Sequence, residues 1–259
     1  MNKVALITGA SGGIGYAFAE ILAKEQYDLV LVARNVEKLF AMKQDFLNRF
    51  RVNVHVLVYD LGQTDAAFKI FQDISRLGFT VDVLINNAGI GDWGAFADSN
   101  EFKLEQLLQL NIVTLTQLTR LLLAQMVKQK SGKILNVAST AAFVFGPLMS
   151  VYFASKAYVL SFSCAIAQEL KDSGVTVTCL CPGPTATDFQ AATFPHEIRL
   201  TSKRRLPSAK KVAQYGYQAL VKGKLIAVYG LLNKIFVFSV RFVPRWLTLR
   251  FVYFMQEAI

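Results

Sequence analysis

The sequence has few of the residues that build metal sites or disulfide frameworks. Its 259 residues include only three cysteines and two histidines. Cys179 and Cys181 have no second pair that would complete a zinc site, and His55 and His196 stand alone. We therefore expect no metal site, and we interpret the cysteines as small buried residues in a reducing compartment.

Long apolar runs are also missing. No stretch of eighteen uninterrupted apolar residues occurs, although hydrophobic residues make up 53% of the chain, so an ordinary membrane-spanning helix is not expected. The N-terminal MNKVALITGA passes directly into a strand-like pattern and then glycines, unlike a secretory leader. The expected location is cytoplasmic, with peripheral contact on the inner face of a membrane if the basic tail described below binds lipid.

Acidic residues are nearly absent from the last part of the chain. Residues 1–189 hold 16 basic and 16 acidic side chains, whereas residues 190–259 hold 12 basic and 2 acidic ones, so the tail carries the whole net charge of +10 (12 − 2 = 10). A neutral body with a basic, apolar tail suggests an anionic surface as partner. Nucleic acid is not expected, because the basic residues are mixed with aliphatic ones and no recognised binding module occurs.

Short apolar, β-rich runs alternate with amphipathic stretches along the chain. The apolar runs cover residues 3–8, 28–33, 53–59, 81–86, 132–138, 175–181 and 224–229. The amphipathic stretches lie near residues 14–25, 36–50, 64–76, 100–129, 152–172 and 208–221. Strands that are apolar on both faces and followed by helices predict a doubly wound, Rossmann-type α/β fold with a parallel sheet of about seven strands flanked by helices.

A glycine-rich turn, TGASGGIG (8–15), follows the first apolar run. Its glycines allow backbone N–H groups to approach a pyrophosphate at a helix N-terminus, although the G-x-x-x-G-x-G spacing differs from the usual G-x-G-x-x-G. The segments NNAG, ST and PGPTAT follow the fourth, fifth and sixth runs. These segments should therefore meet at the carboxyl edge of the sheet, where ligands bind in such folds.

The end of the second run bears on the coenzyme. Ala33 occupies the place where an NAD site usually carries an acidic residue, and Arg34 follows it. Because a guanidinium suits a 2′-phosphate, we expect NADP(H), with NAD(H) less favoured; an exposed arginine that merely opens a helix is the alternative. Asp60 ends the third run and would bond the adenine amino group, although turn residues of this type are common there.

The ordered set of motifs resembles the classical short-chain dehydrogenase/reductase family, and its C-terminal extension resembles the ketoacyl and hydroxysteroid-type reductase subgroup. The matching segments are TGASGGIG, NNAG, the isolated Asn111, Ser139, YFASK and PGPTATDF, which span about residues 3–190. Ser139 and Tyr152 lie thirteen residues apart, as the family pattern requires.

The resemblance implies a catalytic tetrad. Tyr152 and Lys156 are four residues apart and would share one helical face. Tyr152 would be the general acid, and Lys156 would lower its pKa by opposite charge and bond the nicotinamide ribose. Ser139 would orient the substrate carbonyl. Asn111 would lie in a locally distorted helix and hold a water that leads from Lys156 to solvent.

The resemblance also implies a set of cofactor contacts. Asn86 and Ala88 would line the adenosine side and brace the sheet, and Ser11 would join Arg34 at the 2′-phosphate. NADP-preferring members often carry a basic residue where this chain has Gly12. The expected cofactor-binding residues are Gly9, Ser11, Gly13, Ile14, Gly15, Arg34, Asp60, Leu61, Asn87, Ala88, Gly89, Tyr152, Lys156, Pro182, Gly183, Thr185 and Thr187.

The substrate is expected to be a lipophilic carbonyl or alcohol. Residues 189–206 fall where the family has its variable substrate loop. An apolar pocket would be lined by Phe143, Val144, Phe145, Phe189 and Phe194, which could equally be ordinary core residues. We expect one domain over 1–259: a cofactor-binding and catalytic core (1–188), a substrate loop and helix (189–222), and a last strand with basic, apolar helices (223–259).

Residues 230–259 add two helix-like segments separated by Pro244. Lys234, Arg241 and Arg245 recur among aromatic residues, a pattern typical of an interfacial membrane anchor; packing on the domain or across a dimer is the alternative. The family resemblance implies a homodimer or homotetramer formed through the helices at 100–129 and 152–172. The expected function is an NADP(H)-dependent carbonyl/alcohol oxidoreductase, and the rival is a non-catalytic nucleotide-binding scaffold that docks through its tail.

Overall fold

A single parallel sheet organises the chain, which we describe over residues 2–194 and 206–257 of a computed structural model. The strands are β1 (Val4–Thr8), β2 (Asp28–Ala33), β3 (Val54–Val58), β4 (Val81–Asn86), β5 (Gly132–Val137), β6 (Val175–Cys181) and β7 (Ile226–Val228). Their order is β3-β2-β1-β4-β5-β6-β7, and every neighbouring pair is parallel. The predicted seven-stranded Rossmann-type sheet is confirmed.

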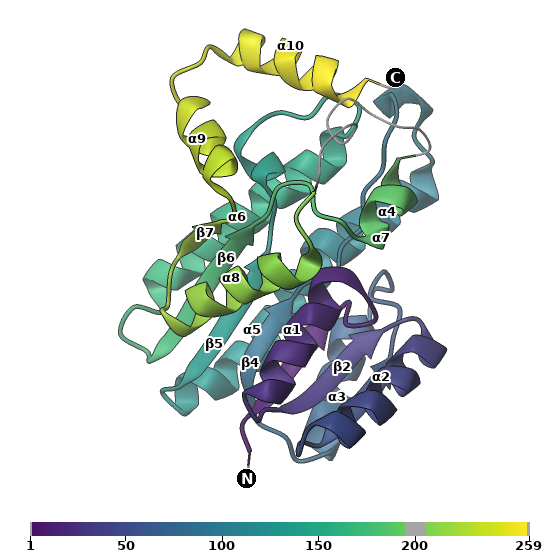
Figure 1. The fold of residues 1–259 in the computed structure, drawn as a ribbon, viewed down its shortest axis with the longest axis vertical. Helices are drawn as coiled ribbons and strands as arrows, with labels where there is room; N and C mark the ends of the chain where they lie inside the picture. The colour runs from purple at the N-terminus through teal and green to yellow at the C-terminus, as the bar shows by residue number, and fades with distance from the viewer. Residues whose placement is uncertain (1, 195–205, 258–259) are drawn as a thin grey trace.

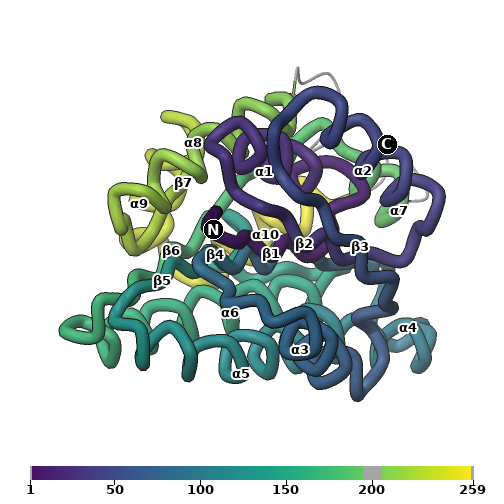
Figure 2. Tube along the Cα trace, turned by 90° about the horizontal axis from the view of Figure 1, so that it is seen from below, coloured from purple at the N-terminus to yellow at the C-terminus, as the bar shows by residue number. Residues whose placement is uncertain are grey.

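Helices cover both faces of this sheet (Figures 1 and 2). One layer contains α1 (Gly13–Lys24), α2 (Val36–Arg49) and α8 (Ala209–Val221). The opposite layer contains α3 (Ala66–Arg76), α5 (Leu115–Lys128) and α6 (Ser150–Glu169). Each layer packs its apolar side chains onto one face of the strands, which explains why β1 and β2 are buried along almost their whole length.

The strand predictions are accurate to within a few residues. The runs at 28–33, 81–86 and 175–181 match their strands exactly as predicted. The stretch predicted as one helix over 100–129 is instead α4 (Glu101–Leu108), a π-helical turn η2 (Gln109–Thr114) and α5. The short elements η1 (Phe96–Asp98), η3 (Thr140–Phe143) and α7 (Asp188–Thr193) were not predicted.

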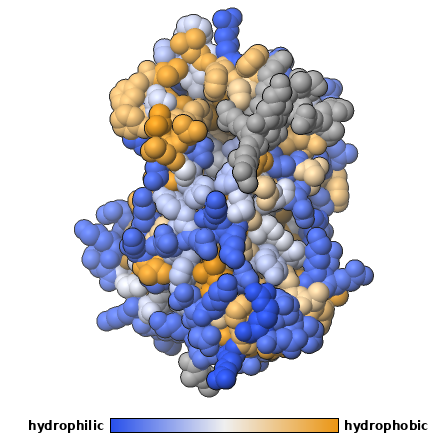
Figure 3. Space-filling view, in the orientation of Figure 1, coloured by the Kyte–Doolittle hydropathy of each residue, from blue (hydrophilic) through white to orange (hydrophobic). Residues whose placement is uncertain are grey.

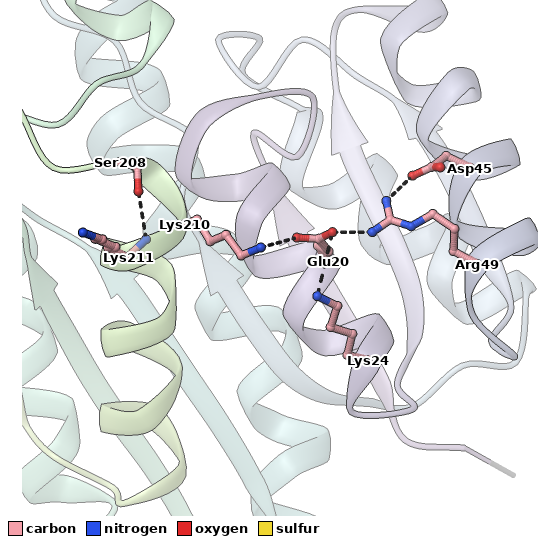
Figure 4. Close-up of polar contacts among 7 residues, drawn as sticks. All are labelled: Glu20, Lys24, Asp45, Arg49, Ser208, Lys210 and Lys211. Carbon is pink, nitrogen blue, oxygen red and sulfur yellow. Dashed lines mark hydrogen bonds and ion pairs between the residues drawn. The ribbon is translucent and has the colours of Figure 1, made fainter.

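A charged cluster centred on Glu20 ties three helices of one layer together (Figure 4). The Glu20 carboxylate on α1 pairs with Arg49 of α2, and it lies 4.0 Å from Lys210 of α8 and from Lys24. The hydrogen bond from Arg49, opposed by desolvation, lowers the pKa of Glu20. The position of α8 beside α1 is therefore supported by charge as well as by apolar packing.

The C-terminal extension forms two helices, as the sequence predicted. They are α9 (Leu231–Ser239) and α10 (Arg245–Gln256), with Pro244 between them. Val237 of α9 packs into a cluster with Cys179 and Cys181. In Figure 1, α10 lies across the end of the molecule to which the strands point.

Two helical stretches are long and apolar enough to cross a membrane by length and composition, Glu101–Lys128 and Ser150–Glu169. Both contribute buried side chains to the core cluster beneath the sheet, including Leu118, Leu122 and Ile166. Core helices of soluble domains have the same composition, and we interpret these two as core helices.

Candidate active site

The glycine-rich turn between β1 and α1 has a shape that only glycine allows. Gly9 and Gly13 have φ values of 63° and 53°. A Cβ atom at Gly15 would lie 2.2 Å from the Gly9 carbonyl oxygen, so no side chain fits there. Helix α1 begins after Gly12 without a side-chain cap, which leaves its N-terminal N–H groups available to an anion. This cradle fits a dinucleotide pyrophosphate.

The segment after β4 fastens this cradle to the sheet. The Thr8 hydroxyl oxygen accepts hydrogen bonds of 3.0 Å from the backbone N–H groups of Asn87 and Ala88. The Asn87 side-chain amide donates to the carbonyl oxygens of Thr8 and Gly9 at 3.0 and 3.2 Å. Asn87 and Ala88 therefore lie directly beside the glycine turn, as expected for cofactor-contacting residues.

Asn86 lies at the end of β4 and is only 3% exposed. Its amide donates to Thr119 Oγ1 at 2.8 Å and to Asn136 Oδ1 at 2.9 Å. These two hydrogen bonds join β4 to α5 and to β5, as expected of a residue that braces the sheet.

Arg34 is exposed at the carboxyl end of β2, and Ser11 is half-buried on the neighbouring glycine turn. The N–H of Ala10 donates to the Val32 carbonyl at 3.3 Å, which joins the two segments. Lys38, which sequence reasoning missed, is also exposed here and lies 3.7 Å from Asp188 at the start of α7. Arg34 and Lys38 therefore both lie exposed on the segment that follows β2.

Asp60 and Leu61 follow the end of β3. Asp60 Oδ1 accepts the Gly62 N–H at 3.0 Å and shapes a turn. Leu61 is 5% exposed and belongs to the core, and its carbonyl accepts a hydrogen bond of 2.8 Å from Thr114 Oγ1. Any contact between Leu61 and a cofactor would have to use its backbone, because its side chain faces the core.

Tyr152 and Lys156 share one face of α6, as their spacing predicted. The Lys156 Nζ atom lies 5.7 Å from the Tyr152 ring centroid and donates a hydrogen bond of 3.0 Å to the Val137 carbonyl. Ser139 follows the end of β5, and its hydroxyl hydrogen bonds Tyr152 and caps η3 by accepting from the Ala141 N–H at 3.1 Å. The structure therefore brings these three side chains together.

Asn111 completes the group from the π-helical turn, where the resemblance implied a distorted helix. It is 1% exposed, and its side chain exchanges hydrogen bonds of 3.0 and 2.9 Å with the backbone of Ile90. A Cβ atom at Gly89 would lie 3.3 Å from both Asn111 Oδ1 and Lys156 Nζ. The two side chains thus meet at Gly89, and π turns are frequent at functional sites.

The electrostatics of Tyr152 differ from the sequence-based expectation. Burial raises the pKa of Tyr152 to about 12, and the hydrogen bond with Ser139 acts in the opposite direction. Burial also lowers the pKa of Lys156 to about 8. Desolvation therefore outweighs, in the net pKa of Tyr152, the effect expected from the opposite charge of Lys156. Tyr152 therefore remains protonated at neutral pH.

The apolar surroundings of Tyr152 match the predicted pocket in part. Val144 and Phe194 pack in one cluster with Tyr152, and the Phe189 ring centroid lies 5.5 Å from that of Tyr152. Phe143 is partly buried and packs against a separate core cluster, which favours the core alternative for this residue. Phe145 is 47% exposed and lies at the rim.

Sequence reasoning missed five members of this cluster, Trp93, Ala141, Met149, Phe153 and Val252. Val252 comes from α10, and the carbonyl of Gln256 on the same helix accepts a hydrogen bond of 3.0 Å from Trp93 Nε1. Helix α10 is more than 90 residues away along the chain from Tyr152, and no local sequence pattern predicts the contact of Val252 with the Tyr152 cluster. In the sequence, the only sign of this contact was that Trp93 follows the NNAG segment closely.

The segment after β6 closes the other side of the site. The Pro182 carbonyl accepts the Thr140 N–H at 2.8 Å, next to Ser139. Thr185 is buried and donates to the Gly183 carbonyl at 2.9 Å, and Thr187 Cγ2 would lie 3.1 Å from a Cβ atom at Gly13. Thr187 therefore lies against the glycine turn. Most of the predicted substrate loop at 189–206 lies outside the described residues, which omit 195–205.

Comparison with known proteins identifies the family. The short chain dehydrogenase model matches residues 3–198. The chain is 29% identical over 252 residues to the very-long-chain 3-oxoacyl-CoA reductase of Rattus norvegicus, covering 95% of this chain and 77% of that protein. It is 30% identical over 206 residues to the 3-oxoacyl-(acyl-carrier-protein) reductase FabG of Aquifex aeolicus (strain VF5), covering 80% and 83%.

A solved structure agrees with these relatives. The short-chain dehydrogenase from Sphingobium yanoikuyae, in complex with NADPH, superposes with a TM-score of 0.82 at 28% identity and covers 92% of this chain and 93% of that one. The chain belongs to the short-chain dehydrogenase family. It is an oxidoreductase of the type that interconverts CH–OH and C=O groups.

Proposed function

We propose that this protein is an NADP(H)-dependent reductase that converts the carbonyl of a lipophilic small molecule to an alcohol. The observation that carries the proposal is the convergence of Ser139, Tyr152 and Lys156. It is supported by the relatives named as 3-oxoacyl reductases and by the similar NADPH-bound structure. Arg34 and Lys38 support NADP(H), because both are cations near the expected 2′-phosphate.

Bound NADPH would supply the hydride for the substrate carbon. Tyr152 donates its phenolic proton to the carbonyl oxygen, and the Ser139 hydroxyl donates a hydrogen bond to the same oxygen. Lys156, one turn away, stabilises the phenolate that forms when the proton leaves. Asn111 fixes the π turn and the Ile90 backbone beside Lys156 and holds the water that returns a proton from solvent.

The high pKa of Tyr152 is compatible with its role as a proton donor. A group with a pKa of about 12 carries its proton throughout the neutral range and needs no prior protonation before it donates. Alcohol oxidation would need the phenolate form, which burial disfavours.

The protein is further proposed to be cytoplasmic, with peripheral membrane contact through residues 230–259. A homodimer or homotetramer would form through α5 and α6. The exposed face of α6 carries small residues at helical spacing, Ser161 and Ala165, next to the partly exposed Tyr158. Such a stripe permits close approach of a second helix.

The function is tested by following NADPH absorbance with a panel of long-chain ketones and aldehydes. Tyr152→Phe should lower kcat by on the order of 10²–10⁴-fold and leave the Kd for NADPH within about twofold, because the ring and its packing remain. Tyr158→Phe is the matched control: it lies on the same helix, and its hydroxyl hydrogen bonds with that of Thr116 at 3.0 Å. Nucleotide binding without turnover of any carbonyl by the native protein would instead support the rival scaffold function.

A further inference from the structure

The surface of α9 and α10 is unusually apolar. Twelve large hydrophobic side chains between residues 231 and 254 are 39–81% exposed, out of 27 such side chains in the described residues. They are Leu231, Leu232, Ile235, Phe238, Phe242, Val243, Trp246, Leu247, Leu249, Phe251, Tyr253 and Phe254. Figure 3 shows the resulting hydrophobic surface over this end of the molecule. Patches of this kind mark interaction sites.

The charged side chains along α9 and α10 are all basic. Lys234, Arg241, Arg245 and Arg250 are exposed, and residues 230–256 contain no Asp or Glu. Arg250 lies 5.8 Å from the Trp246 ring centroid. Guanidinium groups beside exposed tryptophan and phenylalanine suit the boundary between anionic headgroups and acyl chains.

The inner face of α10 forms part of the substrate side of the active site. Thr248, Val252 and Gln256 recur every four residues and are 7%, 6% and 1% exposed. Val252 packs in the cluster that contains Tyr152, and Arg245 lies 5.8 Å from the ring centroid of Phe145 at the rim. A single helix therefore separates the exposed apolar surface from the catalytic tyrosine.

We infer that α9 and α10 lie in the interface of an anionic lipid bilayer and that the active site takes its carbonyl substrate directly from that bilayer. The inference rests on the proposed reductase function and adds the source of the substrate. A long-chain ketone dissolved among acyl chains would pass beside α10 to Tyr152 without crossing water. The polar, NADP(H)-binding part of the molecule would remain in the aqueous phase.

Charge complementarity favours lipid over a second copy of the chain. A two-fold contact through this surface would bring the four cations of each copy against the same four of the other. The segment offers no carboxylate between residues 230 and 256 to pair with them. Anionic headgroups supply the missing charge.

The test uses the full-length protein and vesicles of phosphatidylcholine with or without phosphatidylglycerol. The protein should float with the anionic vesicles and should largely remain in solution with the neutral ones. Phe238→Ser/Phe242→Ser should lose this binding, whereas the control Phe40→Ser/Phe68→Ser, also exposed but on α2 and α3, should keep it. Arg241→Gln/Arg250→Gln should weaken binding by on the order of tenfold or more, since each surface cation contributes about 1 kcal/mol.

Kinetics then test the source of the substrate. With a long-chain ketone embedded in the anionic vesicles, the Phe238/Phe242 variant should lose at least about tenfold in apparent kcat/KM relative to the control. With a short, water-soluble ketone the two should be equal. Equal rates of the two variants on the embedded ketone would overturn the inference. So would a Phe238/Phe242 variant that loses self-association while its vesicle binding is unchanged. Failure of the native protein on every ketone would instead overturn the proposed function.

Discussion

At the scale of single residues, the types and order of the candidate catalytic side chains could be read from the sequence, but their ionisation could not. The four-residue spacing of Tyr152 and Lys156 predicted a shared helical face, and the structure places them so. Their pKa values depend on burial, which only the folded chain defines. Lys156 is 5% exposed and donates to the Val137 carbonyl at the end of β5, and burial lowers its pKa while it raises that of Tyr152.

These two shifts predict the pH dependence of the reaction. Carbonyl reduction needs protonated Tyr152 and charged Lys156, whose pKa values are about 12 and about 8. The kcat/KM for reduction should therefore be nearly constant from pH 6 to about 7, reach half its plateau value near pH 8 and fall further at higher pH, as Lys156 loses its proton. Measurement of NADPH oxidation across this range checks the prediction.

Substitution of Lys156 tests whether this residue, and not Tyr152, causes the decrease at high pH. Lys156→Gln should lower the rate at pH 7 and abolish the decrease centred near pH 8, because no group then titrates there. A slow variant that shows the same decrease in rate near pH 8 would mean that a group other than Lys156 causes this decrease.

At the scale of single elements, regular strands and helices were predictable and irregular ones were not. Strong apolar runs gave β2, β4 and β6 with their observed limits. The π turn at Gln109–Thr114 has no distinct composition, since its hydrogen-bonding shift depends on Asn111 binding the Ile90 backbone. The short helix α7 also lacks a distinct composition. Its Phe189 packs near Tyr152, a contact that only the folded chain makes.

The glycine turn gives a prediction at this scale. Gly15→Ala should destabilise the protein by roughly 1–3 kcal/mol, because its Cβ would meet the rigid Gly9 carbonyl oxygen. Thermal unfolding without cofactor measures the effect, with a decrease in Tm of about 2–4 °C for each kcal/mol.

Gly12→Ala is the matched control. Gly12 has extended backbone geometry, and the nearest atom to its added Cβ would be Asp188 Oδ2 at 3.8 Å. Its stability should stay within about 0.5 kcal/mol of the native value. Equal Tm values for the two variants would show that the turn has more room than the structure indicates.

At the scale of the whole molecule, the sequence distinguished a neutral body from a basic tail, and the structure shows where the tail lies on the body. The candidate catalytic residues lie at the carboxyl edge of the sheet, and the extension covers this edge with α10 (Figure 1). The contact of Val252 with the Tyr152 cluster joins segments about 100 residues apart along the chain, so periodicity could not predict it.

The proposed oligomer is tested at this scale. Ser161→Arg/Ala165→Arg should convert the dimer or tetramer to a monomer, because it places charge on the exposed face of α6 proposed as the subunit contact. Light scattering after size-exclusion chromatography measures the mass, and Ala41→Arg, on the exposed face of α2, should leave it unchanged. A native protein that is already monomeric would reject the proposed assembly.

The central claim is that hydride passes from NADPH to a carbonyl carbon while Tyr152 donates the proton. The most direct measurement uses NADPH deuterated at the nicotinamide C4 position with a long-chain ketone, followed by NMR of the alcohol product. We predict deuterium on the carbinol carbon with native protein and with Tyr158→Phe, and almost no product with Tyr152→Phe. Deuterium that arrives only from heavy water, or undiminished product formation by Tyr152→Phe, would contradict the account.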